Sequence, residues 1–588
     1  MIRDPVCGEP VDEKGAIKVD ARGRTYYFCS EYNRHVFLDQ TMVAYFSMEI
    51  GLTSDMHTYS GGLGILAGDV IKTSAELRIP IVGVSLVSKK GYLRQEITPD
   101  GKQIDHTDEW EPANFMKELP TRIALTIQGR RVNVKGWMYE FQNPAGGMVP
   151  VIFLDTDVEG NANDDKEITS FLYGGDETYR LKQEIVLGIG GVKMLDACGF
   201  KIRKYHMNEG HSSLLTLELL RRNDMDADRV KDLCIFTTHT PVEAAHDKFS
   251  YDMVSSVMGE LISIEELKKL GDTDALNMTS LALNLSRYVN GVSEEHMAFS
   301  NSLFPSHHIS AITNGVHSYS WTCESFRKLY DKYIPGWPLE PARLVRVVAI
   351  PGEEIWLAHM EAKDALISYV KERTKTTLDR DVLTLGFARR ATAYKRPTLL
   401  FSDMSRLRGV KSKGNIQMIF AGKAHPNDLE GKRLIEEIYG YMKELNDKIK
   451  VVYLENYDMD VAARITSGVD LWLNTPMPPL EASGTSGMKA AHNGVTTFSV
   501  LDGWWVEGWI EDVTGWAIGP IPAEKMSESE RRMREKEDLY SKLEYVIIPK
   551  FYDDRDGWIH MMRNSIGKVA YYFNSHRMMM AYATEAYM

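Results

Sequence analysis

Short apolar runs that alternate with longer helical patterns constrain most strongly how this sequence can fold. The first series begins near residue 41, and its runs lie at 42–47, 79–87, 149–155, 234–240 and 309–315. A second series follows residue 380, with runs at 382–388, 416–424, 449–456, 469–474 and 495–503. Fully apolar strands separated by helices are typical of a parallel sheet that helices cover on both faces. The two series predict an α/β chain with two doubly wound, Rossmann-like domains.

The length of the chain, 588 residues, exceeds what one hydrophobic core usually holds, so we expect several parts. A short segment with two cysteines occupies residues 1–40. We place an N-terminal Rossmann-like domain at 41–325 and a C-terminal one at 326–555. The Met- and Tyr-rich stretch 556–588 is predicted to be helical and to pack back on the N-terminal domain.

The charge of the chain limits the ligands that it can bind. Lys and Arg total 69 against 82 Asp and Glu, which gives a formal net charge of -13. Nucleic-acid binding needs basic surfaces, so we expect no nucleic-acid partner. A phosphate ligand would need a local basic site built against this overall charge.

The cysteines and the hydropathy pattern bear on the compartment. The chain has five cysteines, an odd and sparse number that argues against a secreted disulfide framework. Its first ten residues, MIRDPVCGEP, lack the apolar core of a signal peptide, and no apolar run is long enough to span a bilayer. We therefore expect a cytoplasmic protein with no membrane partner.

A glycine-rich turn at Gly61-Gly62-Leu63-Gly64 is the first candidate for chemistry. Glycines let a backbone approach a phosphate closely, and a helix that starts here would point its free amides outward. The alternative is a tight turn between a strand and a helix with no ligand, and the motif alone does not separate the two.

Four cations lie within eight residues directly after the apolar run 382–388: Arg389, Arg390, Lys395 and Arg396. A charge run is usually a solvated face. These cations, however, follow a predicted buried strand, and ligands of parallel sheets bind at the carboxyl ends of strands. Arginine and lysine both suit phosphate, so we favour a phosphate site.

The run EASGTSGMK, from Glu481 to Lys489, combines a Gly/Ser/Thr-rich turn with the predicted start of a helix. Such a turn can hold an anion. A lysine near cations and a helix N-terminus has a lowered pKa, which favours the free amine that condenses with an aldehyde. From the pattern alone, an exposed helix lysine is the more probable interpretation.

Three short polar clusters end apolar runs elsewhere: Asn208–His211, Thr238–Thr240 and Thr313–Gly315. Small polar side chains of this kind suit hydrogen bonds to sugar hydroxyls. The histidines do not form a HExxH metal motif. For any one of them, a structural role is as probable as a functional one.

Together these motifs resemble those of the glycogen/starch (α-glucan) phosphorylase family, in the right order over roughly residues 42–580. EASGTSGMK resembles the family's EASGTGNMK, which implies that Lys489 carries pyridoxal 5′-phosphate. RRATAYKR is similar to KRIHEYKR, THTPVEA to NHTVLPEA, and TNGVHSYSW to TNGITPRRW. The resemblance also implies the two-domain GT-B glycosyltransferase architecture. Ser486-Gly487 departs from the family's Gly-Asn, next to the position of the cofactor phosphate.

The resemblance implies a role for further residues. The implied catalytic set is Lys489, Arg390, Lys395 and His239, with Arg390 and Lys395 on the substrate phosphate. Around the cofactor it implies Thr485, Ser486, Arg389, Gly62, Trp321 and Tyr457. Around the sugar and its phosphate it implies Gly61, Gly62, Asn314, Glu481, Ser483, Gly484 and His239.

The implied reaction is phosphorolysis of the non-reducing-end glucose of an α-1,4-glucan, with retention, to α-glucose 1-phosphate. The cofactor's aldehyde is tied up by Lys489, and its 5′-phosphate takes part in acid–base chemistry. The partners are then an α-glucan and inorganic phosphate, and a homodimer is a family-level expectation. The match resembles a compact bacterial or archaeal branch, without the regulatory region of animal enzymes.

Two rival functions remain open. A nucleotide-sugar-dependent glucan synthase shares this architecture, but it usually has a lysine two residues before the first glycine, where this chain has Tyr59. Such enzymes also lack the lysine motif. A non-enzymatic binding protein is disfavoured by the intact set Arg390, Lys395, Glu481 and Lys489.

Residues 1–40 resemble a YHS metal-binding domain in DPVCG and TYYFCSE. The resemblance implies Cys7 and Cys29 as ligands of a soft metal. A further ligand cysteine is missing, since Asn33 stands near its position, and His35 could substitute. The alternative is a small structural appendage.

Overall fold

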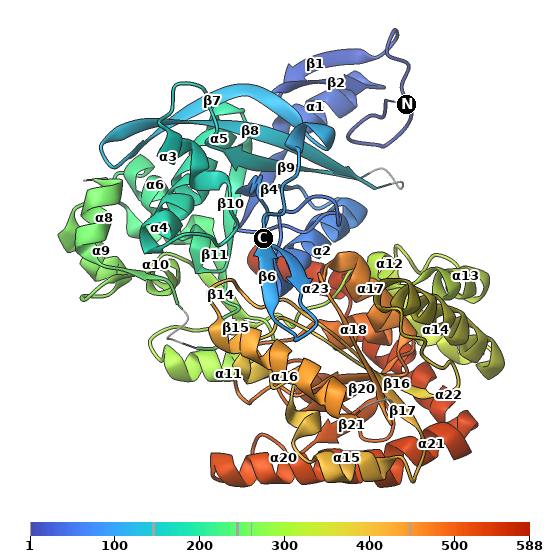
Figure 1. The fold of residues 1–588 in the computed structure, drawn as a ribbon. Coiled ribbons are helices and arrows are strands. Elements are labelled where there is room, and N and C mark those ends of the chain that lie inside the picture. Colours follow the sequence, from blue (N-terminus) through green and yellow to red (C-terminus); the bar gives the residue numbers. More distant parts are fainter. Residues whose placement is uncertain (1, 144–146, 243–245, 260, 446–447) are drawn as a thin grey trace.

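A computed structural model describes residues 2–143, 147–242, 246–259, 261–445 and 448–588 (Figure 1). It is an α/β structure with two large sheets, one in each half of the chain, and a small sheet at the N-terminus. Among the described residues, no helix is both long and apolar enough to cross a membrane.

The sheet of the N-terminal half has nine strands in the order β15-β14-β11-β10-β3-β4-β9-β8-β7. Seven of them, from β15 to β9, are parallel, as the apolar runs predicted. Their bounds are β3 Thr41–Ser47, β4 Ile81–Leu86, β9 Met148–Asp155, β10 Lys201–Asn208, β11 Cys234–Thr237, β14 Tyr288–Gly291 and β15 Ser310–Ala311.

An antiparallel hairpin extends this sheet, and the doubly wound prediction did not include it. Strands β7 (Lys117–Ile127) and β8 (Arg130–Gln142) pair with each other, and β8 pairs with β9. Buried and partly exposed residues mix along both strands, whereas β4 and β16 (Leu383–Ala388) are buried throughout. This is the pattern of a sheet edge that helices cover on one face only.

The second sheet is parallel throughout, in the order β18-β17-β16-β19-β20-β21. Its other strands are β17 Ile416–Ala421, β18 Lys450–Leu454, β19 Leu471–Asn474, β20 Thr496–Val500 and β21 Gly515–Ile518. Strand β16 lies between β17 and β19, so residues that follow β16 emerge near the middle of the sheet edge.

The helices that matter most for the site are α2 (Gly62–Leu77), α12 (Ser318–Trp321), α14 (Gly352–Thr374), α16 (Leu429–Leu445), α17 (Met459–Gly468), α18 (Ser486–Ala491), η10 (Ser565–Ala570) and α23 (Ser575–Ala581). Helix α17 starts where the Asp458 side chain accepts a hydrogen bond from Val461 N (2.8 Å), the usual N-cap arrangement. Helices α14 and α17 pack against each other beside the second sheet.

The end of the chain returns to the N-terminal half, where α23 packs against α2. Met578, Met579 and Tyr582 share a buried cluster with Val43 and Tyr45 of β3. The two halves are therefore held together by the last residues as well as by the linker between them.

The N-terminal segment forms β1 (Ile17–Ala21), β2 (Arg24–Phe28) and α1 (Glu31–Asp39) around a small core of Tyr26, Phe28 and Phe37. It lies beside β8 in Figure 1, in dark blue. The contact is partly polar, because the Tyr26 hydroxyl donates to Glu140 Oε1 (2.9 Å) and Arg24 pairs with the same carboxylate, and partly apolar, because Met148 packs against the small core.

Candidate active site

The polar motifs lie at the carboxyl ends of parallel strands. Arg389 and Arg390 follow β16 directly, and the EASGTSGMK run lies between β19 and β20. In the other sheet, His239 follows β11 and Asn314 follows β15. The carboxyl edge of such sheets is where ligands bind, so the strand order brings these motifs to the expected edge.

Glu481 joins two of the predicted cations. Its Oε2 accepts hydrogen bonds from Arg389 Nη2 (2.6 Å) and Lys395 Nζ (2.5 Å). Burial would raise the pKa of Glu481, but Arg389 and Lys395 outweigh it and lower that pKa to about 2. Glu481 is therefore a carboxylate at any working pH, and the two cations already have one anionic partner.

Arg390 differs from its neighbours Arg389 and Ala391 because it is an exposed residue. With the described residues it makes no hydrogen bond and no ion pair. It lies against the glycine loop, since a Cβ added to Gly61 would come within 2.9 Å of Arg390 Nη2. An unpaired, accessible guanidinium beside a helix N-terminus is suited to an anion.

The glycine loop is partly occupied by a carboxylate that the sequence analysis missed. Glu49 Oε2 accepts from Ser60 N (2.5 Å) and Gly61 N (3.1 Å). Gly62 begins α2, no side chain of the described residues caps that helix, and a Cβ on Gly62 would meet nothing within 4 Å. Gly62, and not Gly61, therefore has the open backbone amide of this loop.

Lys489 is buried in α18, and its Nζ lies 3.8 Å from the centroid of the Trp321 ring. Burial lowers its pKa to about 8, Asp69 opposes this, and Lys72 adds to it. Within the described part of the chain, Nζ makes no hydrogen bond and no ion pair. The exposed helix lysine, favoured by the pattern alone, is therefore wrong, and a reactive amine fits the site.

The predicted cofactor residues near Lys489 differ in whether their side chains already form hydrogen bonds. Thr485 is the N-cap of α18, with no side-chain cap bond, and the Ser486 hydroxyl accepts from Trp472 Nε1 (3.0 Å). Gly484 has a φ of +78°, and a Cβ there would meet Glu481 and Arg389. The Tyr457 hydroxyl donates to Ala388 O (3.4 Å), so its ring stands beside the end of β16.

His239 is uncharged in this environment. Burial lowers its pKa to about 3, and His296, His206 and His211 add to the effect. Its Nε2 lies 2.7 Å from Asn208 Oδ1, and since an amide oxygen can only accept, Nε2 carries the hydrogen. Nδ1 is then an acceptor that can bind a hydroxyl. Glu243 and Ala244, from the same motif, lie outside the described residues.

Three buried polar atoms on predicted site residues have no hydrogen-bond partner among the described residues: Arg389 Nη1, Ser483 Oγ and Asn314 Oδ1. Buried polar groups are normally paired, so these atoms indicate room for a polar ligand. The loops that carry Ser483 and Asn314 are linked, because Ser293 Oγ donates to Ala482 O (2.6 Å) and Asn314 N bonds to Val292 O (3.1 Å).

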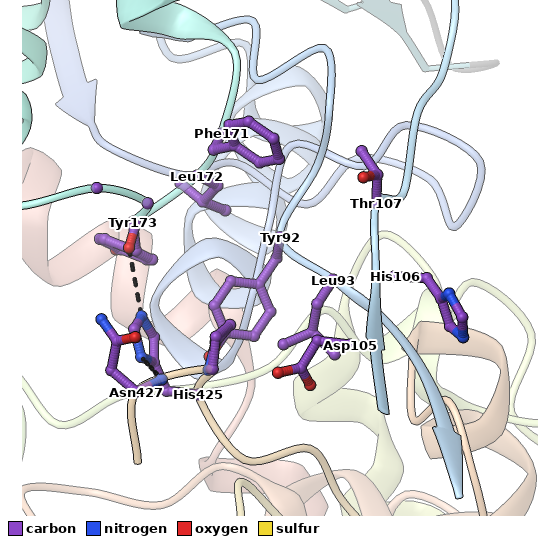
Figure 2. A pocket seen from close by; sticks show the side chains of 13 residues that line it. Tyr92, Leu93, Asp105, His106, Thr107, Phe171, Leu172, Tyr173, His425 and Asn427 are labelled. Atoms are coloured by element: carbon purple, nitrogen blue, oxygen red, sulfur yellow. Dashed lines mark hydrogen bonds between the residues drawn. The ribbon is translucent and has the colours of Figure 1, made fainter. Parts of the chain in front are cut away.

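A cavity of about 230 Å³ lies between the two halves of the chain (Figure 2). Its wall combines aromatic and polar side chains: Tyr92, Phe171, Tyr173, Asp105, His425 and Asn427. It adjoins the glycine loop, because the Tyr173 hydroxyl donates to Glu49 Oε1 (3.0 Å). No pattern in the sequence points to this cavity, although the pair Gly174-Gly175 after Tyr173 indicates a turn.

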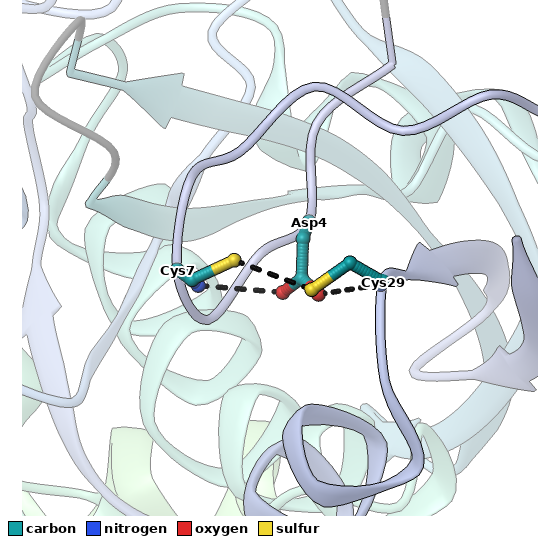
Figure 3. A group of neighbouring side chains, drawn as sticks. All are labelled: Asp4, Cys7 and Cys29. Atoms are coloured by element: carbon teal, nitrogen blue, oxygen red, sulfur yellow. Dashed lines mark hydrogen bonds between the residues drawn. The ribbon is translucent and has the colours of Figure 1, made fainter.

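The N-terminal segment brings Asp4, Cys7 and Cys29 together, with one ligand atom of each within 4.8 Å of the others (Figure 3). The two Sγ atoms are 3.6 Å apart. Asp4 is already used, since it accepts from Val6 N, Cys7 N, Cys29 N and Asn33 Nδ2. This leaves two thiols, fewer ligands than a structural zinc site requires.

Comparison with known proteins identifies the family. A model of the carbohydrate phosphorylase family matches residues 247–517, and a YHS domain model matches residues 2–41. A maltodextrin phosphorylase of Thermococcus litoralis is 38% identical over 93% of this chain and 70% of its own length. A glycogen phosphorylase of Aquifex aeolicus is 35% identical over 94% and 88%, and one of Mycobacterium tuberculosis 33% over 93% and 71%. The resemblance inferred from the motifs is confirmed, and this chain belongs to the carbohydrate phosphorylase family, with a YHS domain at its N-terminus.

Proposed function

We propose that this α-glucan phosphorylase uses inorganic phosphate to release the non-reducing-end glucose of α-1,4-glucans or maltodextrins as α-D-glucose 1-phosphate, with retention of configuration. One observation carries the proposal: a buried Lys489 amine, with no hydrogen bond or ion pair among the described residues, lies in the same β19–β20 segment as Glu481, which is paired to Arg389 and Lys395. A sugar-nucleotide synthase has no need of such an amine.

We also propose the GT-B arrangement for the two halves, with Rossmann-like domains at 41–325 and 326–555. Two features support it: the carboxyl ends of both sheets carry the polar motifs, and the lining of the 230 Å³ cavity comes from both halves. The return of α23 to α2 supports a C-terminal segment at 556–588 that closes the molecule. We expect a homodimer, which light scattering of the purified chain would test.

The site residues fit pyridoxal 5′-phosphate. Lys489 offers the amine for covalent attachment, Trp321 gives a flat apolar wall, and Arg389 Nη1 is a buried donor that has no partner among the described residues. Thr485, Ser486, Gly62 and Tyr457 would complete the pocket. When bound, this cofactor supplies a phosphate group that can exchange a proton with the substrate phosphate.

The protein's main task in the reaction is to hold two anions side by side. Arg390 and Lys395 would bind the substrate phosphate and Arg389 the cofactor phosphate, which offsets the repulsion between them. Lys395 must then share its charge between Glu481 and the phosphate. Substrate phosphate donates its proton to the glycosidic oxygen, which leaves with the shortened glucan, and a phosphate oxygen bonds to the anomeric carbon on the same face.

The sugar would be held by neutral and acceptor groups. His239 Nδ1, Asn314 Oδ1, Ser483 Oγ and Glu481 offer the hydrogen bonds that glucose hydroxyls need. Gly61, Gly62 and Gly484 lack side chains that would fill the space. The remaining glucan suits the cavity, because its aromatic rings can stack on sugar faces while Asp105 and Asn427 bond to hydroxyls.

The deciding experiment measures glucose 1-phosphate released from maltodextrin as phosphate is varied, for wild type and Lys489→Ala. We expect phosphate-dependent release by the wild type and none by the variant, together with a borohydride-reducible chromophore only in the wild type. Elongation of glucan from a sugar nucleotide, by a colourless protein, would instead establish the synthase.

A second, separate proposal concerns the YHS domain. We propose that Cys7 and Cys29 offer a two-thiolate site for a soft monovalent ion such as Cu⁺, supported by their 3.6 Å separation. Titration of the full chain with Cu⁺ under a competing chelator tests it. Binding that survives in Cys7→Ser/Cys29→Ser would contradict it.

A further inference from the structure

The unexplained feature of the site is the pair of buried charges on α2 that faces Lys489. Asp69 and Lys72 are 2% and 7% exposed, and neither belongs to the residues that the motifs assigned to cofactor or substrate. Buried charges are costly unless they are paired or have a task. Asp69 and Lys72 lie three residues apart and so share one face of the helix.

Asp69 holds the ring on which the Lys489 amine lies. Its Oδ2 accepts from Trp321 Nε1 (3.0 Å) and from His317 N (3.1 Å), and its Oδ1 lies 3.3 Å from the same indole nitrogen. All its partners are donors, as an ionised carboxylate requires. Trp321 is thereby fixed at both ends, since Asn493 Nδ2 donates to its backbone oxygen (2.8 Å).

Lys72 is placed as a second cation near the same amine. Its Nζ lies 3.4 Å from Ser320 Oγ, on the short helix α12 that carries Trp321. Burial lowers the pKa of Lys72, whereas Asp69 and Glu76 raise it. Its charge disfavours a second ammonium at Lys489, and that of Asp69 favours one.

The other charged groups around α18 are turned away or neutral. Helices α17 and η10 also pack against α18. Arg464 of α17 lies over the Tyr369 ring, and Asp460 and Lys568 are exposed. Strand β20, which also packs against α18, has no charged residue.

Two histidines complete the surroundings of Lys489. Burial lowers the pKa of His492 to about 4, so it is uncharged at neutral pH. His317, the N-cap of α12, turns its ring to Glu76, with Nε2 2.9 Å from Oε1. Asp69 and Lys72 are therefore the charges left to act on the Lys489 amine.

We propose that Asp69 and Lys72 are positioning residues for Lys489: Asp69 fixes the Trp321 ring under the amine, and the two opposite charges set the fraction of amine that is free to attack a carbonyl. The proposal rests on the proposed function, since it assumes that Lys489 binds pyridoxal phosphate. It assigns a task to two residues of α2 that the motifs did not place at substrate or cofactor.

The test uses the full chain, freed of cofactor with a carbonyl reagent and then returned to pyridoxal phosphate over a series of pH values. Each sample is reduced with borohydride, and the labelled Lys489 peptide is quantified by mass spectrometry. The amine reacts only when unprotonated, so the pH of half-maximal rate follows the pKa of Lys489. This readout does not depend on catalytic activity.

The two charge variants should move that midpoint in opposite directions. Asp69→Asn keeps an acceptor for Trp321 but removes a negative charge, so the ammonium is less stable and the midpoint falls by about one pH unit. Lys72→Met removes a positive charge, so the midpoint rises by about one pH unit. Lys371→Met, an exposed lysine near the end of α14, is the matched control and should not shift it.

Trp321→Phe separates positioning from charge. The ring remains, but its bond to Asp69 is lost, so we expect the attachment rate to fall severalfold at every pH with the midpoint unchanged. Midpoints that stay fixed in Asp69→Asn and Lys72→Met, or that move the same way, overturn the inference. If Asp69→Asn does not fold, Lys72→Met decides alone. A wild type that takes up no pyridoxal phosphate at Lys489 overturns the proposed function as well.

Discussion

At the residue scale, the site is distinguished by which charges are paired and which are free. Arg389 and Lys395 share the Glu481 carboxylate, whereas Arg390, next in sequence to Arg389, is exposed and unpaired among the described residues. An anion that enters the site finds Arg390 without a competing partner. Arg390 should therefore contribute most to the first binding of phosphate.

Replacing Arg390 by Ala should lower kcat/KM for phosphate about 100-fold, because one charge-assisted anion contact is lost. Arg390→Lys should recover only part of this loss, since a lysine cannot reproduce the guanidinium fork. Initial rates of glucose 1-phosphate formation at varied phosphate measure both. Arg346→Ala, an exposed arginine elsewhere, serves as control, and an unchanged phosphate dependence in Arg390→Ala would show that the anion binds elsewhere.

Asp502 provides a prediction about stability and pH. Its Oδ2 accepts from Glu481 N (2.9 Å), and burial, with Glu481 nearby, raises its pKa to about 8. An unfolded aspartate titrates near pH 3.9, so the folded chain holds this proton longer. The native state therefore loses stability as the pH rises from about 4 to about 8.

Asp502→Asn removes that titration. We expect the variant to be less stable than wild type by about 1 kcal/mol near pH 4. The two carboxyl oxygens accept from Glu481 N and from Gly503 N, and asparagine has only one accepting oxygen, so one of these hydrogen bonds is lost. The difference in unfolding free energy between Asp502→Asn and the wild type should become smaller or change sign towards pH 8. Denaturant midpoints at both pH values measure it, with exposed Asp553→Asn as control. A difference independent of pH would mean that Asp502 is ionised throughout.

The sequence was enough to predict site residues that lie close together along the chain. Arg389, Arg390 and Lys395 lie in one run after one strand, so their meeting at a sheet edge follows from strand order. Asp69 was missed because its partner Trp321 is 252 residues away. Glu49 was missed because it accepts from backbone amides of the glycine loop, which no residue pattern marks, and from Tyr173, 124 residues away. Periodicity shows that such carboxylates lie on apolar elements, but not what they meet.

At the element scale, the glycine loop and helix α2 act as one structural unit, which contacts the predicted phosphate site at one end and the surroundings of Lys489 at the other. The loop places Gly61 against Arg390, Glu49 holds its amides, and the helix behind it carries Asp69 and Lys72 towards Lys489. The parallel strands were predictable, because unbroken apolar runs require burial on both faces. The β7–β8 hairpin was not, since its mixed pattern contains few apolar runs.

Gly61→Ala tests whether the close approach of the glycine loop to Arg390 matters for phosphate binding. The new Cβ would lie 2.9 Å from Arg390 Nη2, so the guanidinium must shift, while the backbone at Gly61 is extended and tolerates alanine. We expect the phosphate KM to rise on the order of 10-fold with little change in stability. Gly440→Ala, where a Cβ meets nothing within 4 Å, is the matched control. If the two substitutions had equal effects on the phosphate KM, the glycine loop would play no part in phosphate binding.

At the scale of the whole molecule, the chain end fastens the two halves to each other. The last helices follow the C-terminal sheet in sequence but bury Met578, Tyr582 and Tyr587 against the N-terminal sheet. The Tyr587 hydroxyl lies 2.8 Å from His206 Nδ1, whose ring also meets Thr237 Oγ1 (2.8 Å). Burial lowers the pKa of His206 to about 3, so this network is neutral and does not weaken near pH 7.

Two substitutions of Tyr587 therefore separate the free energy of its hydrogen bond to His206 from the free energy of packing its ring against the N-terminal sheet. Tyr587→Phe should cost about 1 kcal/mol of unfolding free energy, the value of one buried hydrogen bond. Tyr587→Ala should cost about 3 kcal/mol or more, because a fully buried ring leaves a cavity. Chemical denaturation followed by tryptophan fluorescence measures both, and exposed Met588→Ala should change nothing.

Because the closure joins the two halves that line the cavity, we expect Tyr587→Ala to raise the KM for maltodextrin before it lowers kcat. If the variant lost stability with no change in that KM, the C-terminal helices would stabilise the fold without helping to shape the cleft.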